Sequence, residues 1–538
     1  MVGHEPAGAH HHALHVCLGP SGPLSGVLGP SGPLSGVLGP SGPLSGVPAR
    51  PRPLSGVPDP PGASAPTRAR ARIAVVGGGI TGLATAWYLR DGLGPDGADV
   101  VLVESSGRLG GKIRTEELGG VAVEAGPDTF LARVPWAVDL ARRLGLDDDL
   151  VAPATGVAYV CHRGRLVPFP PGTVLGVPVT ARSLLGAAQL SPAGKARAAL
   201  DVVLPRRRRL LGPDPSVAEV IGSRLGRQML DRLVEPLVGG INAGRADTLS
   251  LRSAAPQLAA AAASHRSLIL GLRANRAAGA DGSPVFLSVA GGLERLVERL
   301  AASLEAGDLR LHTAATGLAA ENGRWRLTCQ PGPDVTADAV VLTTPAFAVA
   351  PVVAAASPEA AHLLGRIRYA SVVTATLAYR REHLPALPAG SGFLVPRSEN
   401  RLLTACTFST AKWPGIGGDD LVRLRASAGR DGDDRAGRLD DDALVGRLHD
   451  ELATLVGTTD APTAWRVDRW ANGFPQYEPG HDQLVARIEA ELSGLGGVFV
   501  AGASFRGVGI AACVQQAGAT AAKVIEHLSQ QGSATGET

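Results

Sequence analysis

The chain has 538 residues, several times the roughly 100 to 200 residues of a typical domain, so we expect more than one domain. Apolar residues make up 45% and charged residues 19%, a balance that supplies a core and excludes a wholly disordered chain. The 52 basic and 49 acidic residues leave a formal charge of +3, which argues against a protein whose main work is to bind nucleic acid.

The five cysteines are scattered, and none has the C-x-x-C or Cys/His spacing that would hold zinc. We therefore expect reduced thiols, as in a cytoplasm, and no metal site. The most apolar stretch, residues 340–356, contains two prolines and two threonines, so it does not predict a transmembrane helix. The first residues lack the basic-then-apolar order of a signal peptide. The sequence thus predicts a cytoplasmic protein with no transmembrane segment.

Residues 18–47 are three copies of LGPSGPLSGV, and a degraded fourth copy covers 51–57. Proline and glycine at this density oppose both helices and sheets, so we expect residues 1–68 to be disordered. Two interpretations remain open. The segment is either a linker or docking arm, or it has no function and reflects a recently expanded repeat or a start codon assigned too far upstream.

A strand–helix–strand unit begins at Arg72. Residues 73–76 form a short apolar run that ends in glycines, residues 80–90 have helical character, and residues 100–103 form a second apolar run that ends at Glu104. This order is typical of a βαβ unit and predicts a parallel sheet.

The middle of the chain, about 150–280, is rich in Leu, Ala and Arg at helical spacing. Its clearest helix is predicted after Pro215, where Ser216 and Glu219 form a capping box. Its expected apolar face comprises Val217, Val220, Ile221, Leu225, Leu230, Leu233, Val234 and Leu237. From about 285 strands and helices alternate again, and the last predicted helix runs from about 509 to 528. We therefore expect the two ends of the ordered chain to share one domain.

The first chemical motif is G-x-G-x-x-G at Gly77, Gly79 and Gly82. In a chain with 70 glycines, such a match is expected by chance, so its context matters. Here it lies between a strand and a helix, and Glu104 follows near the spacing of about 20 residues typical of dinucleotide sites. The glycines let the backbone approach a pyrophosphate, the helix N-terminus attracts it, and Glu104 accepts hydrogen bonds from a ribose. A tight turn with a solvated glutamate is the alternative, and NAD and FAD sites share these features.

Longer segments resemble a known family. ESSGRLGGKIRT (104–115), EAGPDTFL (124–131) and VFVAGASFRGVGIAACVQQAG (498–518) resemble motifs of the flavin-dependent amine oxidase superfamily. Within it, RLVEPLVGGINAGRADTLSLRSAAPQL (232–258) and GFLVPRSENRLLTACTFSTAKWP (392–414) resemble the bacterial porphyrinogen oxidases, a family that includes coproporphyrinogen III oxidase and protoporphyrinogen oxidase. The resemblance runs from about residue 72 to 529.

This resemblance implies an α/β fold. It comprises an FAD-binding domain with a parallel sheet and two dinucleotide motifs, a mixed-sheet substrate domain and a helical domain. The FAD-binding domain is expected in three segments, 69–150, 285–350 and 481–529. Residues 151–284 would form the helical and substrate domain, 351–480 the rest of the substrate domain, and 530–538 a disordered end.

The family's cofactor contacts carry over to matching positions. They are Gly77, Gly78, Gly79, Ile80, Thr81, Gly82, Glu104, Ser105, Lys112, Gly126, Pro127, Asp128, Thr129, Ala315, Trp470, Val508, Gly509 and Ile510. Ala315 stands where the family usually has Val, and Trp470 is either a flavin contact or a core aromatic residue. FAD is expected to bind noncovalently.

Basic residues are candidates for the substrate's propionates, because guanidinium groups bind carboxylates in a bidentate manner. Arg133 is the predicted substrate contact, and Lys195, Arg245 and Arg397 are further candidates. The run of arginines at 206–209 is either such a site or a membrane-facing surface, or else a solvated basic face.

The resemblance implies an FAD-dependent, six-electron oxidation of coproporphyrinogen III in heme biosynthesis. Oxygen would be the acceptor, H2O2 a product, and a ferrochelatase the enzyme that receives the porphyrin. Because the flavin accepts hydride, we expect no catalytic side chain. Protoporphyrinogen IX oxidation is the first alternative. An amine or carotenoid oxidase and a non-catalytic flavin or tetrapyrrole carrier are the others.

Overall fold

The computed structural model describes residues 70–94, 97–205, 212–277, 284–384, 387–413, 415–416 and 420–534. The predicted disordered tail, residues 1–68, and the arginine run 206–209 lie outside these ranges.

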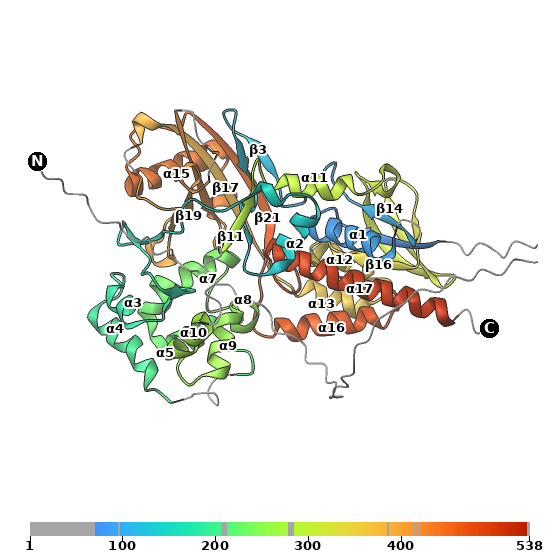
Figure 1. Cartoon of the computed structure of the whole chain (residues 1–538), viewed down its shortest axis with the longest axis horizontal. Coiled ribbons are helices and arrows are strands. Elements are labelled where there is room, and N and C mark those ends of the chain that lie inside the picture. Colours follow the sequence, from blue (N-terminus) through green and yellow to red (C-terminus); the bar gives the residue numbers. More distant parts are fainter. Residues whose placement is uncertain are drawn as a thin grey trace, which may run out of the picture. The chain divides into compact units, whose positions relative to one another are not determined.

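A five-stranded parallel sheet lies between two layers (Figure 1). Its order is β12 (Leu309–Arg310), β2 (Ala98–Val103), β1 (Ala71–Val76), β16 (Ala339–Leu342) and β22 (Val498–Val500). Strand β1 is central, with Ile73 paired to Val100 on one side and to Ala339 on the other. Both faces of β1 and β2 are covered, which explains why these strands are continuous apolar runs without alternation.

One face of this sheet packs on helices from both ends of the chain. These are α1 (Ile80–Leu93), α2 (Pro135–Arg143), α11 (Glu294–Ala302) and α17 (Ile510–Ala534). The other face packs on α12 (Ala346–Val353), α13 (Pro358–Gly365), α16 (His481–Ser493) and a three-stranded sheet of β13 (Ala314–Glu321), β14 (Arg324–Gln330) and β15 (Val335–Ala337). Helix α17 continues to Ala534, beyond its predicted end near 528 and into the predicted disordered end.

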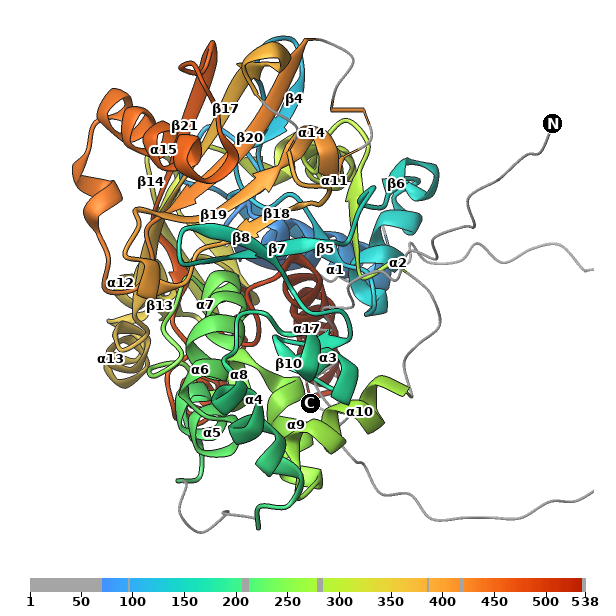
Figure 2. The ribbon, with the colours of Figure 1, turned by 90° about the vertical axis from the view of Figure 1, so that its left-hand side faces the viewer.

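A seven-stranded sheet forms the second major unit. Its order is β21 (Ala464–Pro475), β17 (Tyr369–Arg380), β20 (Leu421–Ala428), β19 (Leu403–Phe408), β18 (Gly392–Leu394), β7 (Ala158–His162) and β8 (Arg165–Pro168). All neighbours are antiparallel except β18 and β7, so the sheet is mixed, as expected. Helix α15 (Asp441–Val456) packs on it beside β21, and the short α14 (Ser409–Lys412) follows β19 (Figure 2).

The third unit is a group of helices with its own core (Figure 2). It contains α3 (Ala181–Gly186), α4 (Pro192–Ala199), α5 (Val217–Leu225), α6 (Arg227–Met229), the π-helical turn η3 (Leu230–Val234), α7 (Glu235–Asn242), α8 (Leu251–Ala254), α9 (Pro256–Ser264) and α10 (Leu268–Ala277). The predicted capping box of Ser216 and Glu219 begins α5.

The single helix predicted from 217 to 237 is wrong, because it is broken at Gly226. This residue has φ +90°, and a Cβ there would lie 2.7 Å from Cγ of Arg197. The chain therefore turns at Gly226 and restarts as α6. The eight residues of the expected apolar face are nevertheless all buried in the core of the helical group.

Short elements complete the structure. They are the hairpins β3 (Thr115–Glu117) with β4 (Ala122–Glu124) and β9 (Thr173–Val174) with β10 (Val177–Pro178), the small sheet β5 (Phe130–Leu131), β11 (Phe286–Val289) and β6 (Leu150–Val151), and the 3-10 turns η1 (Asp147–Asp149), η2 (Leu200–Val202), η4 (Ala306–Asp308), η5 (Arg381–His383), η6 (Arg397–Glu399) and η7 (Arg435–Arg438). The expected fold class, a parallel-sheet domain with a mixed-sheet and a helical unit, is confirmed.

Candidate functional site

The glycine turn between β1 and α1 has geometry that side chains would disrupt. Gly77 has φ +108°, and a Cβ there would lie 2.8 Å from Oγ1 of Thr343. A Cβ on Gly82 would lie 1.9 Å from the Gly77 carbonyl oxygen. At Gly79, by contrast, no described atom lies within 4 Å of such a Cβ. The turn is thus closed around Gly77 and Gly82 and leaves open space beside the backbone of Gly79.

Glu104 follows β2 and binds this turn directly. Its Oε2 accepts a hydrogen bond from the Gly78 N–H at 2.7 Å, and its Oε1 accepts bonds from the Ser106 N–H at 2.7 Å and the Ser105 hydroxyl at 3.3 Å. The Glu104 carbonyl accepts from the Thr313 N–H at 2.8 Å, which brings the start of β13, with Ala315, beside the same loop. The structure therefore groups the glycine turn, Glu104, Ser105 and Ala315.

The segment after Glu104 packs on the glycine turn. The Gly110 N–H donates to the Gly78 carbonyl at 2.8 Å. Lys112 is half-buried, and burial lowers the pKa of its ammonium group. Among the described residues, we find no carboxylate and no hydrogen-bond acceptor bound to Nζ of Lys112. A Cβ on Gly126 would lie 1.8 Å from the Lys112 carbonyl oxygen, so the two predicted motifs are in direct backbone contact.

The N-termini of α1 and α17 lie next to each other, close to Lys112. Burial raises the pKa of the Cys513 thiol in the first turn of α17, while a hydrogen bond with Thr81 of α1 and the charge of Lys112 oppose that shift. The first turns, Ile80–Leu83 and Ile510–Cys513, contain no Asp or Glu. Each helix N-terminus carries partial positive charge, so these two ends and Lys112 create a positive environment suited to an anion.

The EAGPDTFL segment is held by the mixed sheet. The Ala125 carbonyl accepts a hydrogen bond from the Thr374 hydroxyl of β17 at 2.9 Å and one from Nε1 of Trp470 in β21 at 3.1 Å. Arg425 of β20 donates from Nη2 to the Gly126 carbonyl. Three adjacent strands thus hold two consecutive peptide oxygens of a predicted flavin motif, and Trp470 is a hydrogen-bond donor to that motif.

Asp128 of the same segment forms a partly buried ion pair with Lys412 of α14. Nζ of Lys412 in α14 lies 2.6 Å from Oδ2 of Asp128, and Nε1 of Trp413 donates to the same oxygen at 3.3 Å. Burial opposes ionisation, but the charges of Lys412 and Arg425 outweigh it and lower the pKa of Asp128 to about 2. The Asp128 carboxylate is therefore engaged by protein groups.

Glu124, the first residue of this segment, is in the opposite electrostatic situation. Burial raises the pKa of its carboxyl group to about 7. Hydrogen bonds from the Leu293 N–H at 2.6 Å and the Thr115 hydroxyl at 3.2 Å, together with the charge of Arg425, only partly offset burial.

Sequence reasoning missed Glu124, Thr374, Lys412 and Arg425. For Arg425 a signal was available, because the mostly apolar β20 carries charges at 423 and 425 and a charge inside a buried strand needs a partner.

The candidate basic residues have other partners. Arg245 pairs with Asp247 at 2.5 Å, and Lys195 donates to the Leu185 carbonyl at 2.6 Å. Arg397 binds Glu235 at 3.1 Å and two backbone carbonyls. Arg133 is half-buried between β5 and α2.

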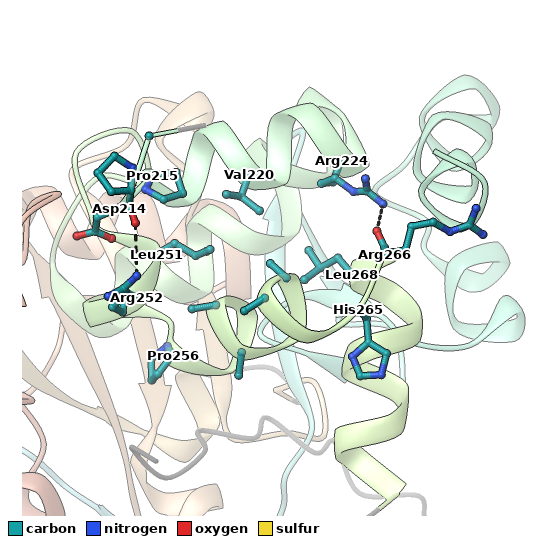
Figure 3. A pocket seen from close by; sticks show the side chains of 16 residues that line it. Asp214, Pro215, Val220, Arg224, Leu251, Arg252, Pro256, His265, Arg266 and Leu268 are labelled. Carbon is teal, nitrogen blue, oxygen red and sulfur yellow. Dashed lines mark hydrogen bonds between the residues drawn. The ribbon is translucent and has the colours of Figure 1, made fainter. Parts of the chain in front are cut away.

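A cavity of about 490 Å³ lies elsewhere, in the helical group (Figure 3). The side chains of Val220, Leu251 and Leu268 line it between α5 and α9, with the alanines of α9. Arg224, at its edge, donates to the Arg266 carbonyl at 2.6 Å and to Asp201 at 2.6 Å. None of the lining residues belongs to the predicted cofactor motifs.

The described part of the chain lacks two features. None of its helices combines the length and the apolar character needed to cross a bilayer. It also brings no three His, Cys, Asp or Glu side chains together in a group suited to a metal ion.

The geometry fits a dinucleotide that carries a pyrophosphate and a ribose. The open backbone at Gly79 and the N-terminus of α1 suit the pyrophosphate, and the Glu104 carboxylate suits ribose hydroxyls. Lys112, with no bound carboxylate among the described residues, adds a positive charge at the same place.

Comparison with known proteins agrees with this chemistry. Residues 80–525 match the family model described as flavin containing amine oxidoreductase. A coproporphyrinogen III oxidase of Bacillus subtilis is 34% identical over 85% of this chain and 99% of its own length. One of Mycobacterium tuberculosis is 36% identical over 85% of this chain and 98% of its own length. A solved structure from Exiguobacterium is 33% identical, with a TM-score of 0.76 over 85% of this chain and 99% of its own. The chain therefore belongs to the flavin-containing amine oxidoreductase family, and its cofactor is FAD.

Proposed function

We propose that this chain is a coproporphyrinogen III oxidase of heme biosynthesis. The observation that carries the proposal is its similarity to relatives of that name over 98–99% of their length. The reaction removes six electrons and six hydrogens from coproporphyrinogen III. Three O2 accept them and become three H2O2. The enzyme would work in the cytoplasm and supply its porphyrin to a metal-inserting ferrochelatase.

The proposed cofactor site follows from the grouping of the predicted residues. The turn Gly77, Gly78, Gly79, Ile80, Thr81 and Gly82 would hold the pyrophosphate with α1, and Glu104 and Ser105 the ribose. Ala315 would make a backbone contact beside Glu104. The flavin end would meet Lys112, Gly126, Pro127, Asp128, Thr129, Trp470, Val508, Gly509 and Ile510. Asp128 would contact it through the backbone, because its carboxylate binds Lys412.

Bound FAD would supply the hydride acceptor for oxidation at a ring-bridging carbon of the substrate. The chain's own residues bind and orient. The N-terminus of α17 favours negative charge close to it, and the hydrogen bonds to Ala125 and Gly126 fix the segment between cofactor and mixed sheet. Arg133 is the proposed contact for a substrate carboxylate, because it is half-buried and lies five residues beyond Asp128 in the same connection. No side chain is assigned a catalytic proton transfer.

The deciding experiment compares two porphyrinogens on one preparation. We expect a higher kcat/KM for coproporphyrinogen III than for protoporphyrinogen IX, measured by porphyrin fluorescence at physiological salt. A clear preference for protoporphyrinogen IX would overturn the substrate assignment but leave the flavin chemistry intact. Flavin that is photoreduced without air and then fails to reoxidise on exposure to air would instead indicate a carrier.

A further inference from the structure

Residues 476–482 connect the helical group to the motif that precedes α17. On one side, the Ser250 N–H, at the start of α8, donates to the Tyr477 carbonyl at 2.7 Å, and the Gly480 N–H donates to Asp214 at 2.7 Å. On the other side, Tyr477 and His481 bind residues 503–507. This segment therefore anchors the turn before α17 to a separate part of the molecule.

Tyr477 binds both ends of that turn with one hydroxyl group. It donates to the Ala503 carbonyl at 2.6 Å and accepts from the Gly507 N–H at 2.9 Å. Its side chain is buried, with 3% exposed, and burial raises the pKa of the phenol. A hydroxyl that both donates and accepts must be neutral, so the geometry and the burial agree.

His481 binds the middle of the same turn. Its ring stacks on that of Tyr477, with centroids 4.0 Å apart and planes 19° apart, and its Nε2 lies 2.8 Å from the Phe505 carbonyl oxygen. Because a carbonyl oxygen only accepts, the imidazole must carry its proton on Nε2. Burial lowers the pKa of His481, which favours the neutral ring.

The turn is further held from the opposite side. The Ser504 hydroxyl lies 2.8 Å from the Tyr369 hydroxyl, and both bind the N–H of Ala346 at the start of α12. The chain then passes from Gly507 through residues 508 and 509 into α17. The position of the α17 N-terminus thus depends directly on where residues 503–507 are held.

We propose that Tyr477 and His481 are positioning residues for the cofactor, which hold residues 503–507 so that the N-terminus of α17 faces the flavin. This inference rests on the cofactor placement given under the proposed function. The partial positive charge of the helix end stabilises the reduced, more negative flavin more than the oxidised form. Loosening the turn should therefore weaken binding of reduced FAD more than that of oxidised FAD.

The first test is Tyr477→Phe in the full chain, with the FAD dissociation constant and the reduction potential of bound FAD as readouts. We expect affinity for reduced FAD to fall about tenfold more than affinity for oxidised FAD, which lowers a two-electron potential by about 30 mV. Tyr379→Phe is the matched control. Tyr379 is also buried and stacked on a histidine, His449, but lies in the core of the mixed sheet. The reduction potential of FAD bound to Tyr379→Phe should stay at the wild-type value.

Gly509→Asp tests the placement of the flavin beside α17 separately from the role of Tyr477. No described atom would contact a Cβ there, and a carboxylate at this helix end should lower the potential if the flavin lies beside it. If Gly509→Asp lowers the potential and Tyr477→Phe does not, the role of Tyr477 is overturned and the cofactor placement stands. An unchanged potential in Gly509→Asp would overturn both.

Two variants of His481 provide an independent test in case Tyr477→Phe does not fold. His481→Gln keeps an N–H donor toward Phe505, and His481→Leu removes it. We expect FAD bound to the glutamine variant to keep the wild-type reduction potential. In the leucine variant the potential should be about 30 mV lower, which corresponds to a tenfold larger loss of affinity for reduced than for oxidised FAD. Equal potentials in the two variants would contradict the inference.

Discussion

The half-buried carboxyl of Glu124 should make the protein less stable as the pH rises from about 4.5 through 7. Burial raises its pKa from 4.5 to about 7, with the Leu293 N–H, the Thr115 hydroxyl and Arg425 acting against burial and Asp128 adding to it. A difference of about 2.5 pH units corresponds to about 3.4 kcal/mol. Because Glu124 is partly exposed to solvent, we expect about 2 kcal/mol. The folded state favours the protonated carboxyl. The stability that this gives is fully present below about pH 4.5 and is lost as the pH rises through about 7.

Glu124→Gln replaces the group with an amide that stays neutral. The variant should equal the wild type near pH 4.5 and be about 2 kcal/mol more stable at pH 8, a gain of about 2 °C in melting temperature by the size scaling of unfolding entropy. The measurement is thermal unfolding from pH 4.5 to 8 for the FAD-free and FAD-loaded protein. Glu117→Gln, at the exposed end of β3, controls for the loss of one carboxylate. A difference between Glu124→Gln and wild type that does not change with pH would refute the reasoning.

Three further predictions concern the cofactor turn, the domain junction and the tail. Gly82→Ala places a methyl group 1.9 Å from a backbone oxygen and should destabilise the FAD-free protein by about 1–3 kcal/mol. Gly79→Ala places its methyl group in open space, so this variant should fold normally but bind FAD more weakly. Equal melting temperatures for the two FAD-free variants would contradict this prediction. Lys412→Met leaves the partly buried Asp128 without its ion-pair partner and should cost about 2–3 kcal/mol in denaturant unfolding. Asp128→Asn in the same chain should restore part of this loss, and no recovery would argue against the pair. A chain starting at Arg70 should match the full chain in kcat and melting temperature, and a loss of several degrees would show that the tail binds the domain.

Features that arise between near neighbours in the chain were predictable from the amino-acid sequence alone. The apolar runs of β1 and β2, the glycine turn and Glu104 were predictable because strand, turn and helix signals lie within about 30 residues of each other. The capping box at Ser216 and Glu219 is local in the same sense. The cofactor class also came from sequence, since the motifs carry it.

Features that depend on long-range contacts became visible only in the folded molecule. Trp470 and Ala125 are 345 residues apart in sequence, and Lys412 and Asp128 are 284 apart, so no local pattern indicates that either pair forms a bond. Arg397 looked available for a substrate until the structure paired it with Glu235. The helix predicted across Gly226 is interrupted because Gly226 has φ +90°, which is not a helical conformation. A side chain's role here is set by the groups that desolvate and pair with it, and folding alone brings those groups together.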